Sequence, residues 1–86
     1  MDSRMPSGRA QDLTPKQSRQ ARALLKWSQV RAAAKASMSE GTIRDFENGK
    51  RLLPPTRIEA IRHALESAGV VIAPESVSLR SQVATQ

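Results

Sequence analysis

The chain has 86 residues, the size of one small domain. It has no cysteine and one histidine, His63, so disulfides and thiolate metal sites are excluded, and no metal or cofactor is expected. No apolar run approaches the roughly 20 residues of a membrane span, and the start lacks a signal peptide, so we expect a cytoplasmic, nucleoid-associated protein. A core of this size is marginal alone, which makes dimerisation the expected source of extra stability.

The net charge of +6 is located in the middle of the chain. Residues 13–69 carry eleven basic and five acidic residues, whereas the residues on either side of this range are balanced. The positive excess therefore belongs to the part that should fold. This distribution favours a polyanion as partner, with a merely solubilising surface as the alternative.

The chain divides into four ranges. Residues 1–12 are polar, contain proline and glycine and show no periodicity, so we expect a disordered arm. Residues 13–69 carry helical patterns, and residues 70–80 carry strand patterns. Residues 81–86 follow the last periodic segment and should also be disordered.

Three residues predict where the first helix begins. Thr14 is the expected N-cap, Pro15 suits the first helical position, and Gln17 occupies the capping-box position. The helix should end near Leu25. Trp27 should then fill the core at the turn into the next helix.

Two short helices joined by a tight turn are predicted next. The first should run from Gln29 to Ala36 behind Ser28 as its N-cap. Its small residues Ala32 and Ala33, together with Ala36, share one helical face. Small residues on a shared face allow two helix backbones to approach closely.

The second helix of this pair should run from Glu40 to about Asn48, behind a serine N-cap. Ile43 and Phe46 lie one turn apart and should face the core. Gly49 should stop the helix in a left-handed conformation. Two short helices with a three-residue turn describe a helix-turn-helix, although an ordinary helical hairpin has the same periodicity.

A last helix is predicted from about Thr56 to Ala68, because Ile58, Ile61 and Leu65 have helical spacing. Residues 70–80 then change to a β pattern and predict two short strands. An isolated hairpin is marginal in water, and its open edges invite pairing with a second copy. We therefore expect a dimerisation tail with contacts from Val70, Val71, Ile72, Val77 and Leu79.

The ordered set WSQ, the following alanines and TIRDFENGKR resembles the helix-turn-helix domain of phage lambda-type repressors, the XRE family. The resemblance covers roughly Leu13 to Gly69. It implies a mainly α fold, a compact four-helix lambda-repressor-like domain, here followed by a short C-terminal β-strand pair. Two positions depart from the family pattern. Ala32 replaces a usual leucine, and Ser37 replaces a usual glycine where φ is commonly positive.

The resemblance also implies a structural ion pair. In lambda-type repressors an arginine on the first helix pairs with the glutamate that precedes Asn-Gly, which places the pair at Arg22 and Glu47. Arg22 lies one turn before Leu25, near the inner face of its helix. A partly buried pair of this kind can be bidentate and orient two helices, whereas two solvated charges are the alternative.

The function implied by the resemblance is sequence-specific binding of double-stranded operator DNA by a homodimeric transcriptional regulator, which we expect to be a repressor. The helix over residues 40–48 would enter the major groove. Contacts are expected from Ser28, Gln29, Ser39, Thr42, Lys50 and Arg51 to the backbone and from Glu40, Gly41, Arg44 and Asp45 to the bases. Because carboxylates accept from cytosine and arginine donates to guanine, G·C pairs are expected in the half-site.

A protein-binding module, such as an antitoxin or anti-activator, is the alternative function. Two acidic residues on the recognition helix, Glu40 and Asp45, would weaken its approach to phosphates. An enzyme is the least expected class, since the chain has no cysteine or tyrosine, no phosphate-binding glycine loop and no paired carboxylates in a pocket.

Overall fold

The structure, a computed structural model of the chain, describes residues 13–74 and 76–80. In these ranges, four helices precede two strands: α2 (Pro15–Leu25), α3 (Gln29–Ala36), α4 (Glu40–Glu47), α5 (Pro55–Ser67), β1 (Val70–Ala73) and β2 (Ser76–Leu79). The expected mainly α, lambda-repressor-like architecture with a C-terminal strand pair is confirmed. The terminal ranges 1–12 and 81–86, for which the sequence predicts disorder, lie outside the described residues.

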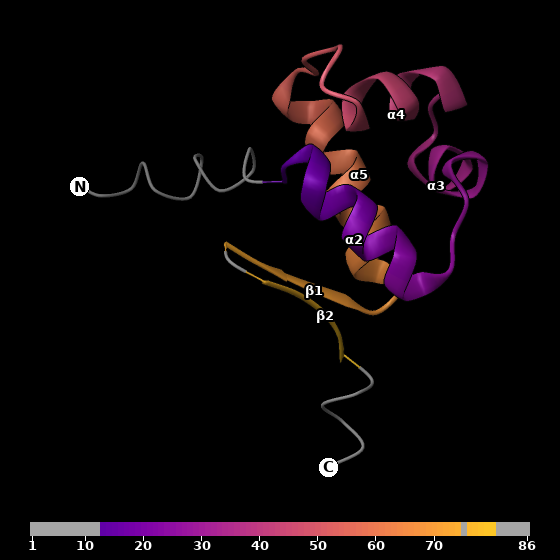
Figure 1. Ribbon diagram of the computed structural model, residues 1–86. Coiled ribbons are helices and arrows are strands. Elements are labelled where there is room, and N and C mark those ends of the chain that lie inside the picture. Colours follow the sequence, from indigo (N-terminus) through magenta and orange to yellow (C-terminus); the bar gives the residue numbers. More distant parts are fainter. Residues whose placement is uncertain (1–12, 75, 81–86) are drawn as a thin grey trace.

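The helices and strands form two layers. α2 and α5 lie over the β1–β2 hairpin, and α3 and α4 lie at the end of the helical layer away from it (Figure 1). Each of the described helices is too short, or too polar, to cross a membrane.

The first three helices each begin behind a hydroxyl side chain. Thr14 accepts a hydrogen bond from the N–H of Gln17, whose side chain accepts from the N–H of Thr14, so the predicted capping box is complete. Ser28 and Ser39 each accept from the N–H three residues further on. α5 has no side-chain cap and begins at Pro55, which has no N–H that requires a partner.

α2 and α3 both end in a left-handed residue that is not glycine. Lys26 and Ser37 each have a φ of 60°. The N–H of the residue that follows each of them returns to a carbonyl five positions back, as in a Schellman motif: Trp27 to Arg22, and Met38 to Ala33. The positive φ that the resemblance implies for Ser37 is therefore present, and it is held by the hydrogen bonds of the turn.

Glycine at either left-handed position should stabilise the protein. The left-handed conformation costs a residue with a side chain about 1–2 kcal/mol, which glycine avoids. Glycine also stabilises the unfolded chain by about 0.4–1 kcal/mol through its greater conformational entropy, and this offsets part of the gain. Ser37→Gly and Lys26→Gly should therefore each raise the free energy of unfolding by up to about 1 kcal/mol, measured by urea denaturation. Ala34→Gly, on the exposed side of α3, is the matched control and should lose about 1 kcal/mol. A loss at Ser37 would contradict the turn geometry.

The core joins all the helices to β1. Small side chains on α2 and α3 allow these helices to approach α4 and α5 closely, and Trp27 packs against the resulting cluster. Ala32 is buried but contributes little volume, as expected from the missing leucine. The core cluster consists of Leu13, Ala21, Ala33, Ala36, Ile43, Phe46, Ile61, Leu65, Val70 and Ile72.

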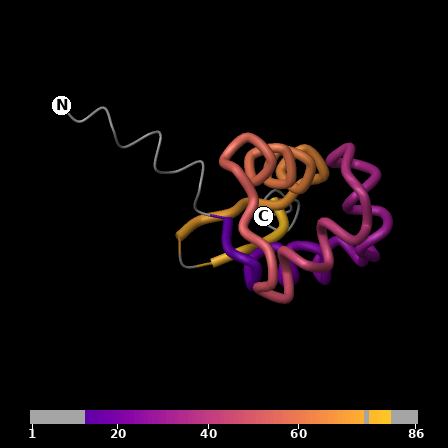
Figure 2. The backbone as a smooth tube through the Cα atoms, turned by 90° about the horizontal axis from the view of Figure 1, so that it is seen from above, coloured from indigo at the N-terminus to yellow at the C-terminus, as the bar shows by residue number. Residues whose placement is uncertain are grey.

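The hairpin belongs to this core through one of its faces. β1 and β2 are antiparallel, and Val70 lies opposite Leu79 while Ile72 lies opposite Val77. These four side chains therefore share one face, which packs against the helices. The backbone of the hairpin beside α2 and α5 can be followed in Figure 2. Val71 is on the other face and is 42% exposed.

This packing bears on which parts of the hairpin can contact a second copy. Val70 is fully buried and Ile72 is 7% exposed within a single subunit, so neither side chain is available to a second copy. Val77 and Leu79 pack partly against the same core. The alternating pattern correctly indicated one apolar face, but the surface that covers this face is α2 and α5 of the same chain. The outward side chain of Val71 and the strand backbone remain for contacts with another subunit.

Candidate nucleic-acid interface

α4 is divided lengthwise into a buried and an exposed side. Ile43, Phe46 and Glu47 are almost completely buried. On the opposite side, the Arg44 side chain is 52% exposed and that of Asp45 is 40% exposed. The helix therefore presents a polar surface to solvent, while its apolar side fixes its orientation against the core.

Arg44 and Asp45 lie close together on this exposed side. Arg44 Nε lies 3.9 Å from Asp45 Oδ1. An ion pair between exposed side chains is worth at most about 1 kcal/mol, so the arginine can exchange this partner for another acceptor. A Cβ on Gly41 would lie 3.5 Å from Arg44 Nη2, so the guanidinium extends over the glycine. Glu40 is exposed one turn before Arg44.

The start of α4 carries two hydroxyl groups. Ser39 Oγ and Thr42 Oγ1 lie 2.9 Å apart and are hydrogen-bonded to each other. The hydroxyl of Ser39 also caps the helix by accepting from the N–H of Thr42. Both residues are therefore ordered before any ligand binds.

The basic residues after α4 are fixed by the end of the helix. Gly49 has a φ of 77°, which turns the chain, and its N–H donates to Phe46 O. The N–H of Lys50 donates to Asp45 O at 2.8 Å. Lys50 and Arg51 are both exposed. Their backbone is thus anchored to α4, and their cationic side chains extend into solvent.

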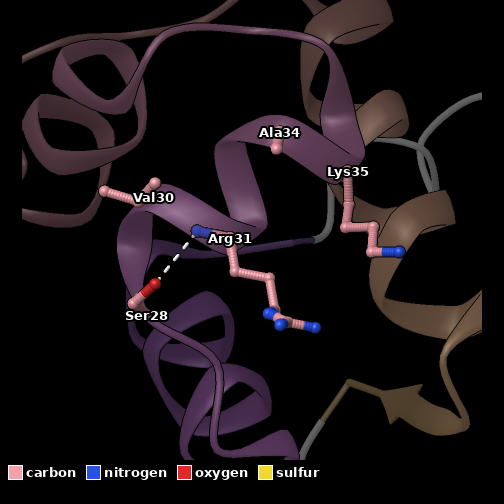
Figure 3. A pocket seen from close by; sticks show the side chains of 5 residues that line it. All are labelled: Ser28, Val30, Arg31, Ala34 and Lys35. Carbon is pink, nitrogen blue, oxygen red and sulfur yellow. Dashed lines mark hydrogen bonds between the residues drawn. The ribbon is translucent and has the colours of Figure 1, made fainter.

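A shallow pocket on the outer side of α3 holds two further cations. Arg31 and Lys35 are four residues apart and extend away from the helix, next to Val30 and Ala34 (Figure 3). Ser28, at the start of α3, accepts from the N–H of Arg31. Neither cation forms an ion pair within residues 13–74 and 76–80. These two cations were not among the predicted DNA contacts, although their i, i+4 spacing opposite the alanine face was the available signal.

The buried carboxylate of Glu47 connects α4 to both neighbouring helices. Arg22, on α2, binds it in a bidentate manner, with Nε 2.9 Å from Oε2 and Nη2 2.7 Å from Oε1. Ser18 Oγ donates to Oε2 at 2.6 Å, and Gln29 Nε2, on α3, donates to Oε1 at 3.2 Å. Arg19 donates to the backbone carbonyl of Glu47. The structure thus brings together the two residues of the expected ion pair and adds three donors.

Some of these donors were missing from the sequence analysis. Ser18 is buried on α2, and its partner depends on tertiary packing. Arg19 precedes Arg22 by almost one turn, which was the available signal. Gln29 was expected at the DNA backbone, whereas its side-chain amide is directed at Glu47 in the structure.

The environment of Glu47 determines its pKa. Burial by itself would raise the pKa, but the hydrogen bonds from Arg22, Ser18 and Gln29 and the charge of Arg22 outweigh burial and lower it from the ordinary value of 4.5. The charged form is therefore the stable one in the folded protein.

Removing either partner of the Arg22–Glu47 pair should destabilise the protein strongly. Breaking a buried pair costs about 3–5 kcal/mol because it leaves an uncompensated charge. We expect a double-mutant cycle of Arg22→Ala and Glu47→Ala, measured by urea denaturation, to give a coupling energy above about 1 kcal/mol. The more exposed Arg62–Glu66 pair, with Nε 3.0 Å from Oε2, is the control and should couple by less. Equal coupling for the two pairs would contradict the structural role of Glu47.

The lowered pKa predicts a specific acid sensitivity. Because the folded-state pKa of Glu47 is below its unfolded value, its contribution to stability is present above about pH 4.5 and is lost as the pH falls through the folded value. Glu47→Gln should abolish this contribution. The difference in free energy of unfolding between the wild type and this variant should therefore be largest near pH 6 and should shrink at lower pH. A constant difference down to pH 3 would contradict the prediction.

Two capped helices joined by a fixed turn, with the second presenting a polar face beside basic residues, define a helix-turn-helix protein. A family model described as helix-turn-helix, that of the XRE type, matches residues 19–68. The chain belongs to this family of DNA-binding regulators. No curated protein matches the chain significantly.

Proposed function

We propose that this DNA-binding regulator is a repressor that recognises a specific operator as a homodimer. The observation that carries the proposal is the lengthwise division of α4. Its buried side is fixed by apolar contacts and by Glu47, while Glu40, Arg44 and Asp45 face solvent together. A helix held in this way can enter the major groove without reorganisation. A repressor would act by occupying the operator and excluding other proteins from it.

Contacts to phosphates would position the protein on the duplex. The N-terminus of α3 supplies Ser28 and the backbone N–H of Gln29, whose side-chain amide is directed at Glu47, and Thr42 lies in the first turn of α4. Lys50 and Arg51 extend from the anchored loop after α4. The net charge of +6 supports this arrangement, because counterion release dominates affinity for DNA.

Contacts to bases would come from the exposed side of α4. Arg44 can donate to guanine, and Glu40 and Asp45 can accept from the amino group of cytosine. The absence of a Cβ at Gly41 leaves open surface beside the Arg44 guanidinium. We therefore expect G·C pairs in each half-site, which a selection of bound sequences from a random DNA pool would identify.

The proposal predicts different effects for Arg44 and Lys50, although both are exposed cations. Arg44→Ala should lose about 1–3 kcal/mol on the selected operator and relax the sequence preference. Lys50→Ala should weaken binding to all sequences alike and reduce the salt slope by about 1. Both variants should be titrated against operator and scrambled DNA over a salt series. Glu59→Ala, on the exposed side of α5, is a control that should change neither property.

Two outcomes would redirect this assignment. An equal loss for Arg44→Ala on operator and scrambled DNA would make Arg44 a phosphate contact. If neither variant alters DNA binding, the protein-binding alternative, an antitoxin or anti-activator, becomes the better proposal.

A further inference from the structure

The two edges of the β1–β2 hairpin differ in how their backbone groups are satisfied. On the β1 edge, Arg62 Nη2 donates to Ile72 O at 3.2 Å, and Arg62 is itself held by Glu66. Gln17 Nε2 donates to Ala73 O at 2.9 Å, near the turn. The Arg62 side chain, from α5, therefore occupies the outward carbonyl of Ile72, which another strand would need.

The β2 edge is open. The N–H of Arg80 donates to Gly69 O, and the register continues this pattern through the pairs Val71–Ser78 and Ala73–Ser76. In an antiparallel pair, hydrogen-bonded and non-hydrogen-bonded positions alternate, so the backbone groups of Val77 and Leu79 point away from β1. No hydrogen bond reaches these groups from elsewhere in residues 13–74 and 76–80.

β2 also lacks the features that protect an edge strand. Its sequence, Ser76–Leu79, has no charged residue and no proline. The apolar side chains of Val77 and Leu79 are only partly covered by the helical core. An uncharged, unpaired edge with residual apolar surface is suited to pairing with another strand.

We propose that β2 pairs antiparallel with β2 of a second copy, about a two-fold axis at Ser78, and so forms a four-stranded sheet. This proposal rests on the homodimer of the proposed function and specifies its interface. A second copy fits because an antiparallel pair of identical strands is self-complementary. The pairing brings no like charges opposite each other, because Arg80 of one copy faces the uncharged Ser76 of the other.

Val77 and Leu79, whose backbone groups point away from β1, determine the register of the proposed strand pair. When Val77 faces Leu79 of the second copy, both outward residues of both strands exchange hydrogen bonds. If the register shifts by two residues, only one of the residues whose backbone groups point away from β1 is still paired on each β2 strand. If it shifts by one residue, backbone groups that point away from β1 face backbone groups that are already bonded to β1. Ser78 is therefore opposite its own copy, at a non-hydrogen-bonded position.

The pairing is compatible with both the core and the DNA-binding helices. It places Val77 beside Leu79 of the second copy on the helix-facing side of the sheet, where each covers apolar surface that the other leaves exposed. The hairpin lies on the side of the molecule away from α4, so both recognition helices stay accessible (Figure 1). The dimer contact here is made by the backbone, with no need for the buried side chains of Val70 and Ile72.

A cysteine scan tests the register directly, because the natural chain has no cysteine. Non-hydrogen-bonded pairs have Cα atoms about 4.5 Å apart, within the range of a disulfide. Ser78→Cys should therefore form a covalent dimer under mild oxidation, seen on a non-reducing gel. Ser76→Cys is the matched control on the same strand and face. Its two copies would lie about 13 Å apart, too far for a disulfide.

A second pair of variants tests the backbone contact. Val77→Pro removes an outward N–H, which an edge strand tolerates, whereas Val77→Ala keeps the donor although it removes more of the apolar side chain than proline does. In sedimentation equilibrium, Val77→Pro should raise the dimer dissociation constant roughly tenfold or more relative to Val77→Ala. Circular dichroism should show the same helix content for both.

The outcomes separate this proposal from the proposed function. A wild-type dimer with no cross-link at Ser78→Cys, or with equal dissociation constants for the two Val77 variants, overturns the β2 interface and leaves the homodimer standing. A protein that is monomeric at all concentrations overturns both the interface and the homodimer. In either case, specific DNA binding is judged separately by the titrations of Arg44→Ala and Lys50→Ala.

Discussion

The arrangement of the helix-turn-helix depends on the buried charge of Glu47. A carboxylate removed from water is costly unless its oxygens are satisfied, so α4 can pack only where α2 and α3 supply donors. Arg22 and Ser18 supply them from α2, and Gln29 supplies one from α3. Apolar contacts alone tolerate small rotations of a helix, whereas a bidentate pair with defined directions does not. The angle of the proposed recognition helix is thus determined by an ionic contact beneath it.

The hairpin combines two roles that use different parts of the same strands. The side chains of Val70 and Ile72 complete the core of one subunit, which a four-helix domain of this size closes poorly with alanine at several inner positions. The backbone of β2 remains at the periphery with outward N–H and C=O groups. One face of the sheet is therefore buried when the subunit folds, and the proposed dimer contact is made by the edge of β2. Neither role competes with the other.

The sequence predicted what depends on near neighbours along the chain. The N-caps Thr14, Ser28 and Ser39 each involve contacts within a few residues, so spacing was sufficient. The left-handed conformation of Ser37 was implied by the resemblance. What covers the apolar face of the hairpin was not predictable, because an alternating pattern shows that a strand has an apolar side without identifying the surface opposite it. The same limit applied to Gln29, whose partner lies on another helix. The resemblance supplied the Arg22–Glu47 pair, which local pattern alone would have left as two charges.

The lengthwise division of α4 has a consequence for evolution. Residues that hold the helix and residues that face outward occupy opposite sides, and the outward residues Glu40, Arg44 and Asp45 lie outside the core cluster. Substitutions on the outward side therefore leave the folding free energy nearly unchanged. After gene duplication, copies of such a domain can diverge in the sequences they recognise without passing through unstable intermediates. The fold fixes the position of α4, whereas the DNA sequence that its outward side recognises can change.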